Sequence, residues 1–119
     1  MNENTKKVYD LEKRTFVFTK NVIEYIKELP KGMTNSEIGK QLMRSAASIG
    51  ANYIEANESL SKKDFVMRVK ICRKEAKESI YWLELSAPQK DKEEEKVKLV
   101  CECTELMKIF ASIIHKVEI

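Results

Sequence analysis

The sequence is poor in the residues that interrupt regular structure. Its 119 residues include only 3 glycines and 2 prolines. Because these two residues mark most turns, few turns are available and the segments between them must be long. Long, rarely interrupted segments are typical of helices, which contain more residues than strands on average. The composition therefore favours an all-α chain.

Residues that build catalytic and metal sites are scarce as well. The chain has one histidine, His115, and Ser112 stands three positions before it, so the Glu-x-x-His motif of di-iron bundles is missing. The three glycines stand isolated at positions 32, 39 and 50, which excludes a glycine-rich phosphate loop. We interpret His115 as a cation near a helix C-terminus. We therefore expect no catalytic residue, no metal and no cofactor, and we expect that the protein is not an enzyme.

The cysteines are few and odd in number. Cys72, Cys101 and Cys103 offer no even set for a disulfide framework. Cys101 and Cys103 lie two residues apart, so a helix points them to nearly opposite sides and they cannot bind one metal ion together. We interpret all three as small apolar residues in or near the core, as free cysteine usually is.

Long hydrophobic runs are also missing. No apolar segment approaches the roughly 20 residues of a transmembrane helix, and no apolar segment follows the polar opening, Met1–Lys7, as it would in a secretory signal. Hydrophobic residues make up 43% of the chain, which suffices for a core at this length. We expect one cytoplasmic domain over residues 1–119, with a frayed N-terminus over about residues 1–9 and no membrane association.

The chain does contain apolar residues at helical spacing, in four separate blocks. Pro30 and Gly32 end the first block, because proline cannot continue a helix and glycine suits its exit. The segment Thr34–Glu37 has the form of a capping box and begins the second block. The stripes of these two blocks are Leu11, Phe18, Val22, Tyr25 and Leu29, and then Ile38, Leu42, Ala46, Ile49, Tyr53 and Ala56.

The third and fourth blocks begin at candidate caps. Ser61 is a candidate N-cap with Asp64 in the first turn, Pro88 ends this block, and Asp91 with Glu94 forms another candidate cap. The third stripe is Phe65, Val69, Cys72, Ala76, Ile80 and Leu83. The fourth block carries two stripes: Val97, Val100, Thr104, Met107, Ala111 and Ile114, and then Leu99, Cys103, Leu106, Phe110, Ile113 and Val117. Two stripes predict a helix that is central or part of a subunit interface.

Four helices joined by short turns predict an antiparallel, up-down-up-down four-helix bundle. In such a hairpin, residues equally far from the turn lie at the same height. Arg44 then lies level with Glu75–Glu78, where we predict an ion pair, and Glu55 lies near Arg68. Small residues fill the middle of the second block, so Gly50 is expected to be a packing contact with a neighbouring helix.

Positive charge is concentrated in the third block. Residues 62–77 contain seven basic and two acidic residues, a net charge of +5, whereas the whole chain carries +3. A row of cations suits phosphate binding by shape and charge without base readout, although an ordinary solvated face is the alternative. No aromatic residue interleaves the row, so stacking on single strands is not expected. The candidate nucleic-acid-binding residues are Lys63, Lys70, Arg73, Lys74 and Lys77.

Several short segments have a specific sequence. The most specific is Ser-Ile-Gly-Ala-Asn-Tyr at 48–53; the others are Leu11-Glu12 with Phe16, Arg44-Ser45, Glu55-Ala56, Ser61–Phe65, Lys74–Glu78 and Tyr81–Leu83. Together they resemble the small bacterial proteins called 23S rRNA intervening-sequence proteins, over nearly the whole chain. The stretch Ser86–Lys92 departs from the family pattern, because it is shorter and more polar than the apolar segment expected there.

The resemblance implies a four-helix bundle that assembles as a ring-like homopentamer. It also implies nucleic-acid binding, which is proposed for this family and for a similar accessory protein of diversity-generating retroelements. It brings no catalytic residues. The polar residues interpreted as fixing helix packing rather than touching a ligand are Arg44, Asn52, Glu55, Glu75 and Glu78.

Two functional hypotheses follow. The first is a non-enzymatic accessory protein that binds structured nucleic acid, RNA in preference to DNA, as a homo-oligomer through the basic row. The alternative is a protein-interaction module that docks a partner through its apolar fourth helix. Phosphate binding weakens steeply as salt rises, whereas apolar docking is nearly indifferent to salt, so the two are distinguishable.

Overall fold

The computed structural model describes the backbone of residues 3–119 and the side chains of residues 11–119. Within these residues the chain forms four long helices, a short 3-10 turn and no strand. The elements are α1 (Glu3–Lys27), α2 (Met33–Asn57), α3 (Lys62–Leu85), η1 (Lys90–Lys92) and α4 (Glu93–Glu118). The predicted all-α class with four helices is confirmed. The frayed N-terminus predicted for about residues 1–9 stays a prediction: α1 begins at Glu3, and residues 1–2 lie outside the described part.

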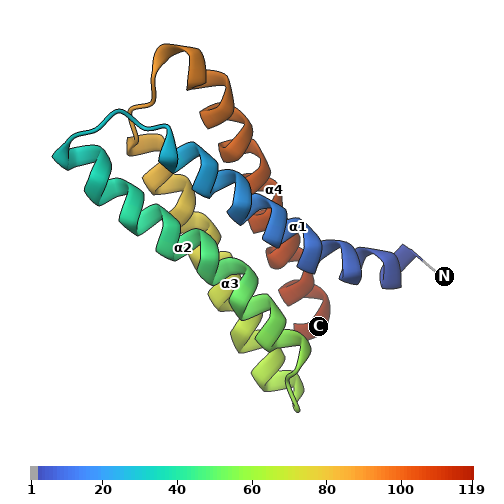
Figure 1. The fold of residues 1–119 in the computed structure, drawn as a ribbon. Coiled ribbons are helices and arrows are strands. Elements are labelled where there is room, and N and C mark those ends of the chain that lie inside the picture. The colour runs from blue at the N-terminus through green and yellow to red at the C-terminus, as the bar shows by residue number, and fades with distance from the viewer. Residues whose placement is uncertain (1–2) are drawn as a thin grey trace.

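The four helices lie side by side in an elongated bundle (Figure 1). α3 packs along both α2 and α4, whereas α1 packs on α2 and less extensively on α4. In α2, the Ser45 hydroxyl forms a hydrogen bond with that of Ser79, late in α3, at 2.7 Å. Asn52, seven residues further along α2, accepts a hydrogen bond from Arg68, near the start of α3, at 3.0 Å. These pairs are consistent with antiparallel packing of neighbouring helices.

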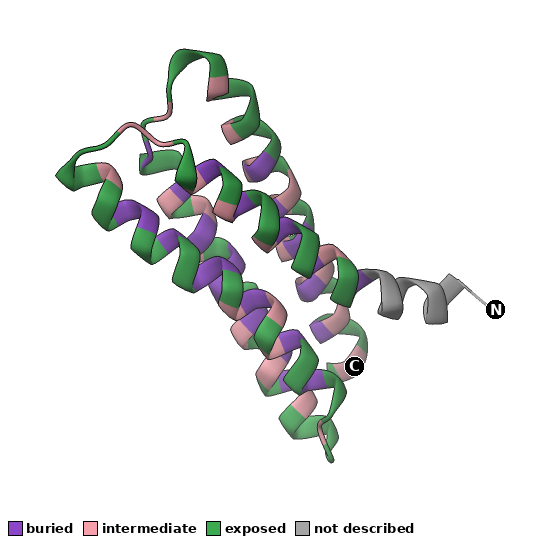
Figure 2. Ribbon diagram, in the orientation of Figure 1, coloured by how far each residue is buried: buried purple, intermediate pink, exposed green. Residues whose placement is uncertain are grey.

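The apolar stripes of the helices meet in one core (Figure 2). Every residue of the stripe predicted for α2 is buried, and so are the α1 residues except Leu29, which is half-buried. In α3 the buried stripe is rotated relative to the prediction, because Val66 is buried while Phe65 and Ile80 are only partly so. Apolar spacing therefore located the core side of each helix to within one residue.

The two stripes predicted for α4 have different environments. Leu99, Cys103, Leu106 and Phe110 are buried in the core. The other stripe borders the surface: Val97 is 60% exposed, and the members that follow it are half-buried until Ile114, which is buried: Val100, Thr104, Met107 and Ala111. The stripe that begins at Val97 thus packs with one edge on the core and leaves the other edge open.

Small residues bring α1 and α2 close together. A Cβ atom added at Gly50 would lie 3.2 Å from Thr15 Oγ1, and one added at Gly39 would lie 3.2 Å from Ile26 Cγ2. Such distances are tighter than ordinary packing, so larger residues would push the helices apart. The prediction that Gly50 is a packing contact is confirmed.

One of the predicted side-chain caps is present. Ser61 is the N-cap of α3, and its Oγ accepts from the Asp64 amide at 3.1 Å, as predicted. The cap predicted at Asp91 is wrong, because Asp91 lies inside η1 and α4 begins at Glu93 with Lys92 at its N-cap and no side-chain cap.

The predicted capping box at Thr34–Glu37 is also wrong, because the N-cap of α2 lies two residues earlier, at Gly32, which has no side chain. Asn35 instead connects two loops. Its amide nitrogen donates to the carbonyl oxygens of Pro30 and Ala87, both at 3.1 Å, and its Oδ1 accepts from the Ala87 amide at 3.2 Å. The α1–α2 loop is thereby tied to the α3–α4 loop.

Candidate nucleic-acid interface

The predicted cations lie along the exposed side of α3. Between the first and the last, 14 residues of helix span about 21 Å, and their spacings place them on one broad side. Arg68, in the same segment, is half-buried and turned toward α2, where it donates to Asn52. The basic row therefore consists of five exposed residues, Lys63, Lys70, Arg73, Lys74 and Lys77.

Two open grooves run along the basic row. The central groove, of about 710 Å³, lies between α3 and α4, and the end groove, of about 860 Å³, lies at the N-terminal end of α3. Lys74 lines both, so the grooves form one continuous surface. The central groove is lined by Arg73, Lys74, Lys77, Glu78, Tyr81, Met107, Lys108 and Ala111. The cations of the end groove are Lys62, Lys63, Lys70 and Lys74.

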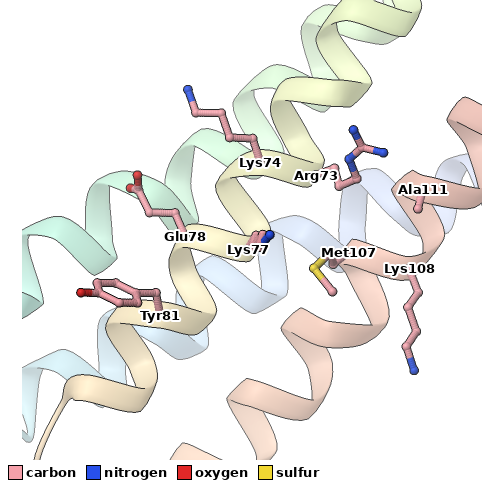
Figure 3. A pocket seen from close by; sticks show the side chains of 8 residues that line it. All are labelled: Arg73, Lys74, Lys77, Glu78, Tyr81, Met107, Lys108 and Ala111. Atoms are coloured by element: carbon pink, nitrogen blue, oxygen red, sulfur yellow. The ribbon is translucent and has the colours of Figure 1, made fainter.

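The side chains of the central groove project in different directions (Figure 3). Arg73 lies on the side of α3 that faces α4, near Ala111, and Met107 lies between the two helices. Lys74 and Tyr81 project from α3 in the direction away from α4. The groove therefore presents cations across the breadth of the exposed side of α3, with apolar surface between the helices.

Acidic side chains compensate this surface only in part. Lys70 Nζ lies 3.2 Å from Glu118 Oε2, but the two side chains are 46% and 50% exposed, so water screens the pair. Glu78, the acid in the central groove, is engaged by Arg44 of α2. The remaining cations of the row therefore face solvent with their charge largely available.

Polar residues connect α2 to α3 beneath this surface. Arg44 pairs with Glu78, and its Nη1 lies 3.5 Å from Glu75 Oε2. The predicted ion pair between Arg44 and this part of α3 is confirmed. Glu75 is only 7% exposed and also accepts a hydrogen bond from Ser48 Oγ at 3.3 Å. These contacts fix the register of α2 against α3.

Asn52 adds further polar contacts between α2 and α3, one helical turn beyond Ser48. Its amide nitrogen donates to the backbone oxygen and the Oγ of Ser48, both at 2.9 Å, while its Oδ1 accepts from Arg68. Glu55 is exposed, and among the side chains of residues 11–119 no ion pair joins it to Arg68. Arg68 is held by the amide of Asn52 instead.

Four residues of the central groove were not among the site residues predicted from the sequence: Tyr81, Met107, Lys108 and Ala111. Their place depends on the register of α3 against α4, which is marked by the Cys103 thiol donating to the Ala76 carbonyl at 3.1 Å. The apolar stripe of the fourth block that begins at Val97 contains Met107 and was the available signal, but it did not indicate which helix it would face.

Two of the three cysteines are core residues. The thiols of Cys72 and Cys103 are buried and donate to the carbonyl oxygens of Ile49 and Ala76. Burial raises the pKa of each thiol to about 12. Cys101 is exposed on α4, so the prediction that all three lie in or near the core is wrong for this residue, which faces away from the bundle.

The described part of the chain lacks a grouping of side chains suited to a metal ion and a helix suited to a membrane. Among its side chains, no three His, Cys, Asp or Glu residues are grouped so that they could hold a metal ion. None of its helices has the length and apolar character needed to cross a bilayer.

Comparisons with known proteins give a family. No curated protein matches the sequence. A similar crystal structure is that of a protein of unknown function from the S23 ribosomal protein family of Bacteroides thetaiotaomicron VPI-5482, which is 31% identical with a TM-score of 0.73; the match covers 87% of this chain and 97% of that one. The sequence model described as 23S rRNA-intervening sequence protein matches residues 7–112, most of the chain. The protein therefore belongs to the 23S rRNA-intervening sequence protein family.

Proposed function

We propose that this protein is a non-enzymatic accessory protein that binds structured RNA, in preference to DNA, through the basic row of an up-down-up-down bundle. The observation that carries the proposal is the continuity of exposed basic surface along α3, through the central and the end groove. The family description, which names 23S rRNA, favours RNA as the ligand. A cytoplasmic location belongs to the same proposal.

The chemistry of the row suits phosphates rather than base edges. The lysine ammonium groups are compact charges that meet phosphate oxygens from several directions, whereas the Arg73 guanidinium can donate two parallel hydrogen bonds to one phosphate. Such contacts release counterions and fix the position of the nucleic acid but carry no sequence information. Recognition would then depend on the shape of the RNA.

We further propose that the protein acts as a homo-oligomer, a pentamer by family resemblance. Exposed apolar side chains support self-association. On α2, Met43, Ala47 and Ile54 lie on one exposed side at spacings of four and seven residues, with Met43 44% and Ile54 52% exposed. On neighbouring α1, Phe16 is 63% exposed. We call Phe16, Met43, Ala47 and Ile54 the α1–α2 face; it is distinct from the basic row on α3.

Charge reversal in the middle of the basic row tests the RNA-binding proposal. The triple variant Lys70→Glu, Arg73→Glu, Lys74→Glu is expected to abolish binding to ribosomal RNA fragments in fluorescence anisotropy, because phosphates would then meet carboxylates. For the unmodified protein, the logarithm of the binding constant should fall with the logarithm of salt with a slope of about −4.5, if each of the five cations meets one phosphate of an RNA helix.

The matched control carries the same change in charge on another part of the surface. Lys27, Lys31 and Lys40 are exposed at the α1–α2 end of the molecule, so reversing them alters net charge equally but leaves α3 intact. The control is expected to bind RNA with only a modest loss. Equal losses in both triple variants, or RNA binding that survives in the α3 variant, would contradict the proposed site.

The second candidate is a module that docks a protein partner through α4. The open edge of the α4 stripe that begins at Val97, which is 60% exposed, is the observation in its favour. Binding of this kind would be nearly indifferent to salt and would not respond to charge reversal on α3, so the same measurements separate it from RNA binding.

A further inference from the structure

Tyr81 is an exposed aromatic residue at one end of the central groove. It is 59% exposed, although the basic row itself contains no aromatic residue. Its ring is held in a T-shaped contact with Trp82, with ring centroids 5.0 Å apart and planes at 73°. Trp82 packs against the core. The Tyr81 ring is thus supported from within the bundle while much of its surface stays open to solvent.

Cations of the row stand next to this ring. Lys77 precedes Tyr81 by four residues and Lys74 by seven, one and two turns along the same side of α3, and all three line the central groove. A phosphate bound at Lys77 would therefore lie about one nucleotide's length from the ring, since one helical turn rises about 5.4 Å, and a phosphate bound at Lys74 would lie one turn further along α3.

The neighbouring acid does not oppose an anionic ligand here. Glu78 lines the same groove but is paired with Arg44, so its charge is offset by a guanidinium from α2. On the far side of Lys77, Met107 and Ala111 add apolar surface from α4. An open groove with an aromatic ring, apolar surface and neighbouring cations combines the features that bind an unpaired nucleotide.

We propose that the central groove holds an unpaired nucleotide of the bound RNA, with its base stacked on Tyr81 and its flanking phosphates on Lys74 and Lys77. The inference rests on the proposed function and specifies its ligand: an RNA helix interrupted by a bulge or loop. A fully paired base keeps its faces inside the stack and cannot reach Tyr81, whereas unpaired bases in bulges and loops can be splayed out onto aromatic side chains.

Two RNA probes that differ by a single unpaired nucleotide test the inference. One is a perfect 20-base-pair RNA duplex, and the other is the same duplex with one unpaired 2-aminopurine, whose fluorescence falls when it stacks. The unmodified protein should bind the bulged probe about tenfold more tightly, the typical contribution of one stacked base, and should quench its fluorescence. Tyr81→Ala should lose both the preference and the quenching while keeping its affinity for the perfect duplex; Tyr81→Phe should keep them.

An apolar residue one turn beyond Tyr81 provides the matched control. Leu85 is 50% exposed at the C-terminal end of α3 and does not line the central groove. Leu85→Ala should keep the preference for the bulged probe. Circular dichroism melting verifies that each variant is folded before binding is compared.

The possible outcomes separate the inference from the proposed function. If both probes bind equally well, or if Tyr81→Ala keeps the preference while the triple charge reversal on α3 abolishes binding, the stacking site is wrong and RNA binding through the basic row stands. If Tyr81→Ala weakens both probes to the same extent, the residue acts on the fold or the duplex contact and the inference is overturned. If the unmodified protein binds neither probe nor ribosomal RNA fragments, the proposed function fails and the inference fails with it.

Discussion

At the scale of single residues, the three thiols should differ sharply in reactivity. Cys101 is exposed, whereas burial raises the pKa of the Cys72 and Cys103 thiols to about 12. Because the thiolate is the reactive form, the native protein at pH 8.5 should consume one equivalent of Ellman's reagent rapidly, and three equivalents after unfolding in guanidinium.

The Cys101→Ser variant identifies the reactive thiol. It should lose the rapid phase and keep two slow equivalents. Rapid reaction of two thiols in the native protein, or a rapid phase that persists in Cys101→Ser, would show that the core around α3 and α4 is open to solvent.

Residue-scale environments were also the hardest to predict from sequence. The three cysteines have the same chemistry, and only the orientation of α4 distinguishes the exposed Cys101 from the buried Cys103. Asn35 looked like part of a capping box, but its hydrogen-bond partners include Ala87, 52 residues away. Local sequence carries no information about a partner in a distant loop.

At the scale of elements, the α2–α3 register depends on a nearly buried carboxylate. The Glu75 side chain is 9% exposed, with Arg44 as its ionic partner. Arg44→Ala should destabilise the protein by about 1–3 kcal/mol in urea unfolding: removing the partner of a buried charge costs about 3–5 kcal/mol, and the half-exposed position of Arg44 reduces this figure.

The double variant Arg44→Ala, Glu75→Gln tests the cause. Removing the isolated charge should restore part of the lost stability, because the neutral amide costs less to bury than an unpaired carboxylate. As a control, Lys40→Ala removes the exposed ion pair with Glu37 and should change the stability by less than about 0.5 kcal/mol. If the double variant is no more stable than Arg44→Ala, the unpaired charge of Glu75 is not the cause of the lost stability.

The existence of the four helices was predictable because apolar residues recur with the helical period and few residues interrupt it. The level of Arg44 beside Glu75 and Glu78 was also predictable, since a short turn after α2 fixes which residues of the two helices stand at equal height. The residues at which the helices begin were less predictable. Ser61 caps α3 as expected, whereas Asp91 lies in a 3-10 turn that the sequence did not indicate.

At the scale of the whole molecule, self-association through the α1–α2 face has a direct test. Light scattering should give the unmodified protein a mass near five times the 13.8 kDa of one chain. The double variant Phe16→Glu, Ile54→Glu should give a mass near that of one chain, because carboxylates in an apolar interface lose their hydration.

Leu60 offers a matched control. It is 98% exposed in the turn between α2 and α3 and lies outside the α1–α2 face, so Leu60→Glu should leave the mass unchanged. A single-chain mass for the unmodified protein would contradict self-association. An assembly that persists in the double variant would instead place the interface on another surface.

Only the basic row of the candidate site, which lies on the single helix α3, could be predicted from the sequence. The row from Lys63 to Lys77 follows from spacing along α3, since residues three, four and seven apart share a side. The contributions of Lys108 and Met107 required the packing of α4 against α3. Tyr81 belongs to the groove because the groove continues beyond the last lysine of the row.

The basic row also makes the charge distribution of the molecule asymmetric. Residues 62–77 carry a net +5, so the rest of the chain carries a net −2. In the field of a polyanion such a molecule experiences a torque that turns α3 toward the polyanion. More encounters then begin in the productive orientation, and association is accelerated. This advantage acts over about 8 Å at physiological ionic strength, close to the size of the side chains that create it.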